Sequence, residues 1–91
     1  MPLTPKIRQQ FKAKAHGLRP IVSIGNKGLT ETVHIEIDRA LTDHELIKIR
    51  IQAERDARRV IFDEVCEIHH CEPVQLIGGI GTIYRKSDKV K

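Results

Sequence analysis

The sequence predicts one α+β domain of two layers, in which a four-stranded sheet packs against helices in the order α-β-α-β-α-β-β. Three observations support this fold class. Apolar residues recur at helical spacing in three separate segments, short strand-like runs lie between and after these segments, and glycine or proline stands at most of the boundaries. With 91 residues, the chain has the length of one small domain, which we expect to cover residues 1–91.

The first helix and the first strand are expected near the N-terminal end. Thr4 followed by Pro5 is typical of a helix start, because the threonine hydroxyl caps a free amide and proline lacks the amide that would go unpaired. Gly17 supplies the helix end. Residues 20–24 form a short apolar run of strand type that Gly25 interrupts. The expected apolar stripe of the helix is Ile7, Phe11, Ala15 and Leu18.

A second helix is expected after Gly28, where Thr30 can serve as its N-cap. Ile35 falls on the opposite side of this helix from the core face, so it needs a separate partner, for which the first helix is one candidate. The expected core face consists of Leu29, Val33, Ile37, Ala40 and Leu41.

The central strand has a regular pattern. Residues 47–51 alternate strictly between isoleucine and a cation, so the three isoleucines face a core while Lys48 and Arg50 point away from it. A third helix follows and ends before Pro73. Its expected inner face is made of Ala57, Val60, Ile61, Val65 and Ile68.

The chain closes with an expected β-hairpin. Residues 74–77 and 82–85 are typical of strands, and the glycine-rich residues 78–81 connect them. No helix follows these glycines, so we interpret them as a turn and not as a phosphate-binding loop.

Charge is distributed unevenly along the chain. The formal net charge is +4, yet residues 1–30 contain six cations and no acid, whereas residues 31–72 contain eleven acids and six cations. A stretch of this length without a carboxylate favours an anion-binding surface. The alternative is that the lysines and arginines only keep a small protein in solution.

The motif Gly25-Asn26-Lys27-Gly28 lies between the first strand and the second helix. Two glycines three positions apart allow a tight turn and a close approach of the backbone to a ligand. Lys27 and the free amides of the following helix start can meet phosphate oxygens, and a GxxG loop clamps a nucleic-acid backbone in this way in KH domains. By itself, the motif is also common as a plain turn between a strand and a helix.

From Leu3 to Arg85, the chain resembles the CRM domain, an RNA-binding module of chloroplast splicing factors and of small bacterial ribosome-associated proteins of the YhbY type. The matching stretches are residues 3–8, 15–20, 22–30, 36–41, 44–50 and 83–85. The sequence GNKGLT and the downstream HELIK are the most specific of them. Residues 78–81 depart from the family, in which bulkier residues are usual here, so the resemblance does not fix the register of the last hairpin.

This resemblance implies a compact domain with a mixed sheet, like the C-terminal domain of the third bacterial initiation factor, and a role in binding structured RNA. In bacteria it implies action in ribosome biogenesis, on precursor RNA of the large ribosomal subunit. The family's GxxG loop corresponds here to Gly25, Asn26, Lys27 and Gly28. The basic surface that it implies consists of Arg8, Lys12, Arg19, Lys48, Arg50 and Arg85.

Composition indicates which kind of RNA contact to expect. Aromatic residues make up 3% of the chain, and Lys48 and Arg50 occupy the open strand face where an RRM carries its aromatic platform. We therefore expect phosphate and shape contacts with folded RNA, and a core position for Tyr84. The alternatives are a small RNA-processing enzyme, and a protein-interaction module without RNA binding that uses Ile35 and the acidic helices.

No cofactor, metal ion, catalytic residue or small-molecule substrate is expected. Cys66, His69, His70 and Cys71 offer four ligand types for zinc within six residues, but on a continuous helix the two thiols point to nearly opposite sides. No apolar run reaches the length of a membrane span, and two cysteines do not form the disulfide framework of a secreted domain. We therefore expect a cytoplasmic location.

Overall fold

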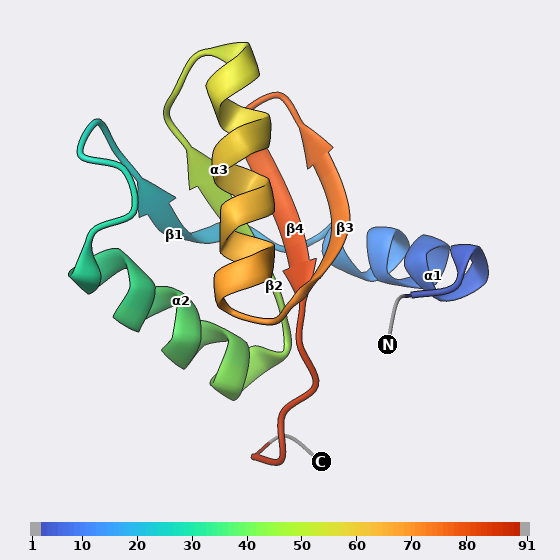
Figure 1. Cartoon of the computed structure of the whole chain (residues 1–91). Helices are drawn as coiled ribbons and strands as arrows, with labels where there is room; N and C mark the ends of the chain where they lie inside the picture. Colours follow the sequence, from blue (N-terminus) through green and yellow to red (C-terminus); the bar gives the residue numbers. More distant parts are fainter. Residues whose placement is uncertain (1–2, 90–91) are drawn as a thin grey trace.

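The computed structural model describes residues 3–89, which form three helices and one four-stranded sheet in the predicted order α-β-α-β-α-β-β (Figure 1). The helices are α1 (Pro5–Ala15), α2 (Glu31–His44) and α3 (Arg55–Ile68). The strands are β1 (Pro20–Ile24), β2 (Leu46–Ile51), β3 (Glu72–Ile77) and β4 (Ile80–Tyr84). The predicted α+β class with a four-stranded mixed sheet is confirmed, but the sheet has helices on both faces, so the domain has three layers instead of the predicted two.

The sheet is mixed and has the strand order β1-β2-β4-β3. β2 pairs in parallel with β1 and antiparallel with β4, and β4 pairs antiparallel with β3. α2 therefore serves as the crossover between two parallel strands. The pairing is irregular between Pro20 and Val22 in β1 and between Pro73 and Gln75 in β3, near the start of each outer strand.

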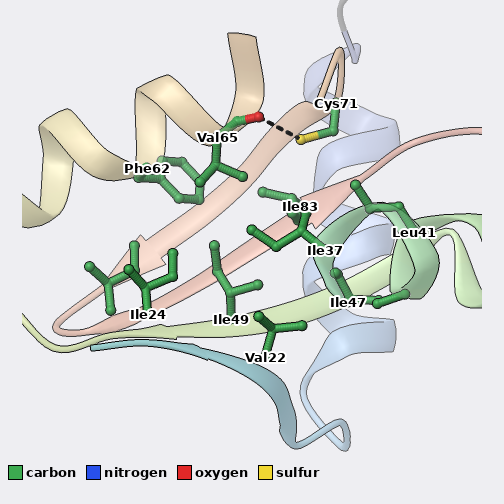
Figure 2. Packing of buried hydrophobic residues seen from close by; sticks show 12 residues of the cluster. Val22, Ile24, Ile37, Leu41, Ile47, Ile49, Phe62, Val65, Cys71 and Ile83 are labelled. Carbon is green, nitrogen blue, oxygen red and sulfur yellow. Dashed lines mark hydrogen bonds between the residues drawn. The ribbon is translucent and has the colours of Figure 1, made fainter. Parts of the chain in front are cut away.

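The main core lies between one face of the sheet and the helices α2 and α3 (Figure 2). The alternation in β2 is confirmed, since Ile47, Ile49 and Ile51 are all buried in this core. α2 contributes Ile37 and Leu41, as its predicted core face requires. The fully buried residues of largest volume in this core are Phe62, Ile24, Ile37, Leu41, Ile47, Ile49 and Ile83.

α1 packs against the opposite face of the sheet, around a smaller cluster. Its Ala15 is buried together with Leu46 of β2 and Val74 of β3. The ring of Phe11 stacks on Tyr84 of β4, with centroids 4.4 Å apart. Tyr84 therefore packs in a core, as predicted, although in this second and smaller one.

The predicted candidate contact between Ile35 and the first helix is wrong. Leu46 packs against α1, whereas its neighbour Ile47 packs against α2 and α3, and successive strand residues point to opposite faces. The sheet thus separates α1 from α2, and Ile35 is 54% exposed.

The predicted inner face of α3 is right for Val65, which is buried, and for Ile61, which packs against the main core, but it is wrong for Ala57, Val60 and Ile68. Phe62 and Val65 are buried, whereas Val60 is 57% exposed and Ile68 is 51% exposed; Ala57 is exposed as well. The position of the Phe62 ring explains this orientation. A Cβ atom at Gly81 would lie 2.7 Å from two atoms of that ring, so the ring fills the space that glycine leaves on β4.

The hairpin connection is shorter than predicted. Only Gly78 and Gly79 lie between the strands, because Ile77 pairs directly with Ile80. Gly78 has a φ of +57°, a conformation that glycine adopts without strain and that two-residue hairpin turns require. Among the described residues, no helix is long and apolar enough to cross a membrane.

Candidate nucleic-acid interface

The GNKG loop joins the end of β1 to the start of α2 and is held in shape by its own backbone. The amide of Gly28 donates to the carbonyl of Gly25 at 2.9 Å, and the amide of Thr30 donates to the carbonyl of Gly28 at 3.0 Å. Gly28 has a φ of +71°, in the left-handed region that favours glycine. Asn26 and Lys27 are both exposed. The loop therefore presents a lysine and an amide side chain to solvent on a closed turn.

The start of α2 is less open to an anion than its sequence suggests. The hydroxyl of Thr30 accepts a hydrogen bond from the amide of Val33 at 3.2 Å, which confirms the predicted cap. Glu31 places a carboxylate in the first helical turn, where it already balances the positive end of the helix dipole. Lys27 and the loop, rather than the helix dipole, are therefore the groups that can attract a phosphate here.

The second basic element is a groove between α1 and the sheet face that carries Lys48 and Arg50. Arg50 is exposed and Lys48 is half-buried. Lys48 shares this groove, of about 260 Å³, with Lys12 and His16 from α1. The rest of the lining consists of Ala15, Gln75, Ile77, Ile80 and Thr82, none of them acidic. An anionic backbone can therefore enter the groove without meeting a carboxylate in its lining.

The N-cap of α1 and its packing on the sheet determine where its cations lie. The hydroxyl of Thr4 accepts a hydrogen bond from the amide of Ile7 at 3.2 Å, which confirms the predicted start. Burial of Ala15 fixes which side of the helix meets the sheet. Arg8 and Lys12, one turn apart, are consequently both half-buried beside that contact.

β2 connects the groove to the GNKG loop. Arg50 pairs with Ser23, close to the end of β1, and the amide of Gln52 donates to the carbonyl of Ile24 at 2.9 Å. Arg50 thus stands at the end of the sheet from which the loop emerges. Lys48 lies two residues, or about 7 Å, further back toward α1. Lys12, Lys48 and Arg50 therefore lie on the α1 face of the sheet, and Lys27 lies in the loop beyond the end of β1; we call these four residues the basic path.

Arg19 lies near the other end of β1. It precedes that strand and borders, together with Lys14, a cavity on the β1 side of α1. Arg19 therefore adds a cation on one side of α1, whereas the groove lies on the other side.

Arg85 is not brought together with the other predicted contact residues. Its guanidinium donates four hydrogen bonds of 3.0–3.1 Å, to the carboxylate and carbonyl of Asp38, the hydroxyl of Thr42 and the carbonyl of His69. Asp38 and Thr42 belong to α2, so Arg85 ties the end of β4 to the helices of the main core. Its donors are engaged within the fold, and we leave it out of the proposed interface.

The structure also reveals basic groups that the sequence patterns did not single out. His16 belongs to the groove. Arg55, Arg58 and Arg59, at the start of α3, gather around a small hollow next to the hairpin residue Gly78. Three arginines within five residues of an otherwise acidic segment were the available signal, and the helical wheel alone did not show where they would point.

The cysteines and histidines at the end of α3 pack within the fold. α3 ends at Ile68, and the amide of Cys71 donates back to the carbonyl of Cys66 at 3.0 Å. Because the helix ends before Cys71, the continuous helix on which the two thiols would point to nearly opposite sides is not formed, and both thiols pack against the main core. The hydrogen bond to Cys71 and burial raise the pKa of the Cys66 thiol. Nε2 of the buried His69 lies 2.9 Å from Nδ1 of His34.

In the described part of the chain, no three potential ligands converge as a metal site would require. Burial, followed by the proximity of His34, lowers the pKa of His69. The lowered pKa favours the neutral ring of His69, and of the two facing ring nitrogens one must donate and the other accept.

Comparisons with known proteins agree with this architecture. The family model for the CRS1/YhbY (CRM) domain matches residues 3–85. A probable RNA-binding protein of Pseudomonas aeruginosa is 46% identical over 90 residues, covering 98% of this chain and 86% of its own. An RNA-binding protein of Haemophilus influenzae is 40% identical, with 98% and 91% covered. The solution structure of a hypothetical protein from Staphylococcus aureus superposes with a TM-score of 0.85 at 34% identity, with 98% and 94% covered. The chain therefore belongs to the CRS1/YhbY (CRM) domain family.

Proposed function

We propose that this chain binds structured RNA through the GNKG loop and the basic path, and that it acts in ribosome biogenesis on precursor RNA of the large subunit. The observation that carries the proposal is the groove lined by Lys12, His16 and Lys48, whose lining contains no acidic residue. The names of the relatives in P. aeruginosa and H. influenzae support RNA as the polyanion.

The chemistry of the surface favours recognition of the RNA backbone. Lys12, Lys48, Arg50 and Lys27 offer cationic donors for phosphate oxygens, and Asn26 adds an amide that can donate to a phosphate or a 2′-hydroxyl. Arg8 and Arg19 widen this surface at its two sides. The open sheet face carries cations and no aromatic platform, so contacts that read backbone geometry suit it better than stacking along a single strand.

The ribosomal assignment comes from the resemblance to small bacterial ribosome-associated proteins. Crosslinking in cells, followed by mapping of the crosslinked nucleotides, tests it. We expect crosslinks to Lys27 and Lys48 that map to precursor RNA of the large subunit. Crosslinks that map only to other RNAs would contradict the ribosomal role and leave RNA binding intact.

The interface itself is tested with a pair of exposed cations. Lys27→Ala combined with Arg50→Ala removes two proposed phosphate contacts, so the slope of log affinity against log salt should fall by about two units. Arg39→Ala combined with Lys86→Ala is the matched control. These residues are also exposed cations, but they lie on α2 and after β4, away from the basic path. A salt slope that falls equally in both double variants would contradict the assignment.

The alternatives from other classes give different results with the same RNA. Labelled structured RNA should be retained intact by the protein in a filter or gel-shift assay. Cleavage products that depend on the protein would indicate a processing enzyme. Failure to retain any RNA at low salt would leave the protein-interaction module as the explanation.

A further inference from the structure

We propose that the cavity on the β1 side of α1 holds an unpaired nucleobase, so that the chain prefers folded RNA with a bulged nucleotide over a continuous duplex. This inference rests on the proposed RNA binding and adds a contact of a different chemical kind. The basic path attracts phosphates of any sequence, whereas this cavity selects a structural feature of the RNA.

The cavity has the size and the lining of a small-ligand site. It encloses about 610 Å³, and such sites typically hold about 300–1,000 Å³. One wall is the stacked pair of Phe11 and Tyr84. Other walls come from Leu18 and Ile21, which are 41% and 53% exposed. An apolar ring that enters the cavity therefore covers aromatic and aliphatic surface that is now partly in contact with water.

The charges around the cavity favour an anionic ligand. Lys14 and Arg19 border it, and no acid lies between residues 1 and 30. The facing elements add His44 and Glu45. Oε2 of Glu45 accepts a hydrogen bond of 2.7 Å from the amide of Ser87, so this carboxylate is partly engaged. A cationic protein segment would meet two like charges, whereas a nucleotide combines a flat apolar base with an anionic phosphate.

The position of the cavity suits a strand that already follows the basic path. Lys12 and His16 of α1 face the groove on one side, while Phe11 and Lys14 face the cavity on the other. Only the width of α1, about 10 Å with its side chains, separates the two hollows. A nucleotide that leaves the helical stack next to α1 can therefore place its base in the cavity while its neighbours stay on the basic path.

Two RNA hairpins with the same stem test the proposal, one fully paired and one with a single bulged adenosine. Base contacts with aromatic surface should make binding of the bulged hairpin about fivefold tighter or more. Tyr84 is the only tyrosine and the chain has no tryptophan, so its intrinsic fluorescence reports on the cavity directly. We expect the bulged hairpin to change this fluorescence more than the paired hairpin does.

Ile21→Glu places a charge in the cavity at a side chain that is already half exposed, and it should abolish the preference for the bulged hairpin. Val60→Glu is the matched control, because Val60 is exposed to a similar degree on α3; it should leave the ratio of the two affinities unchanged. Leu18→Glu repeats the test outside the sheet, in case Ile21→Glu fails to fold by circular dichroism.

The outcomes separate the two proposals. Equal affinity of the parent protein for both hairpins would overturn the base-binding cavity and leave the proposed function standing. A preference that survives both Ile21→Glu and Leu18→Glu would overturn it as well, because the base would then bind elsewhere. Absence of binding to either hairpin at low salt would overturn the proposed function.

Discussion

Arg85 offers the sharpest test of whether a predicted RNA contact is in fact part of the framework. Its guanidinium donates to Asp38, Thr42 and the carbonyl of His69, and its side chain is 21% exposed. Arg85→Ala therefore leaves several acceptors without their donor. We expect this substitution to destabilise the fold, and we expect Arg85→Lys to leave RNA affinity unchanged.

The magnitude follows from the surroundings of each acceptor. The carboxylate of Asp38 is 62% exposed, so the ion pair in water contributes little. The hydroxyl of Thr42 and the carbonyl of His69 are part-buried, and each costs about 1–2 kcal/mol when left unpaired. With the lost packing of the aliphatic stem, Arg85→Ala should lower the free energy of unfolding by about 2–4 kcal/mol. Arg85→Lys keeps the charge but not the fork of donors, so about half of this loss is expected.

Urea unfolding followed by circular dichroism measures these changes. Lys86→Ala is the matched control, since it removes an exposed cation at the next position and should change stability by less than about 0.5 kcal/mol. A free energy of unfolding for Arg85→Ala within that margin of the parent would refute the reasoning. If Arg85→Lys kept its stability but lost RNA affinity, the residue would belong to the interface after all.

Other consequences of the structure can be checked in the same unfolding assay. Gly81→Ala should destabilise by about 1–3 kcal/mol, because the added methyl would lie 2.7 Å from the Phe62 ring; a penalty of equal size in a Phe62→Leu background would show that the ring is not the cause. Thr30→Ala should cost about 1 kcal/mol, since the amide of Val33 loses its acceptor, and no loss would mean that the cap contributes nothing. Stability should also fall as the pH is lowered from about 7.5 to about 5.5. Burial holds the pKa of His69 below 6.5, so the unfolded chain binds a proton in this window that the folded chain does not. Stability that rises as the pH falls would contradict this.

The elements of the fold could be predicted because their signals are local. Capping threonines, glycines at helix ends and the strict alternation of β2 each involve residues that are neighbours in sequence. The orientation of α3 could not be predicted in the same way. Val60, Ile61 and Phe62 are consecutive apolar residues, and the helical period fits more than one of them inward. The space next to Gly81 determines which of these residues points inward, because it accommodates the Phe62 ring, and Gly81 belongs to β4, much later in the sequence.

In the candidate site, too, the features with local sequence signals could be predicted, and those that depend on distant parts of the chain could not. The exposure of Asn26 and Lys27 and the outward direction of Arg50 follow from a turn and a strand pattern. The engagement of Arg85 does not, because α2 supplies its partners from a distant part of the chain. The cavity could not be predicted from the sequence either, since it forms only where Phe11 of α1 and Tyr84 of β4 come into contact.

The irregular starts of the two outer strands bear on how this protein can be stored and handled at high concentration. β1 begins with Pro20, β3 has Pro73 at its second position, and the pairing of each strand shifts close to its proline. A proline removes a hydrogen-bond donor, and a bulge twists the border of a sheet away from a flat approach. A strand from another copy therefore cannot pair along the whole length of either outer strand, because the free backbone groups do not form a long, straight row. Prolines and bulges in the outer strands therefore disfavour edge-to-edge association of two copies of the sheet, and the open basic face needs no change for this purpose.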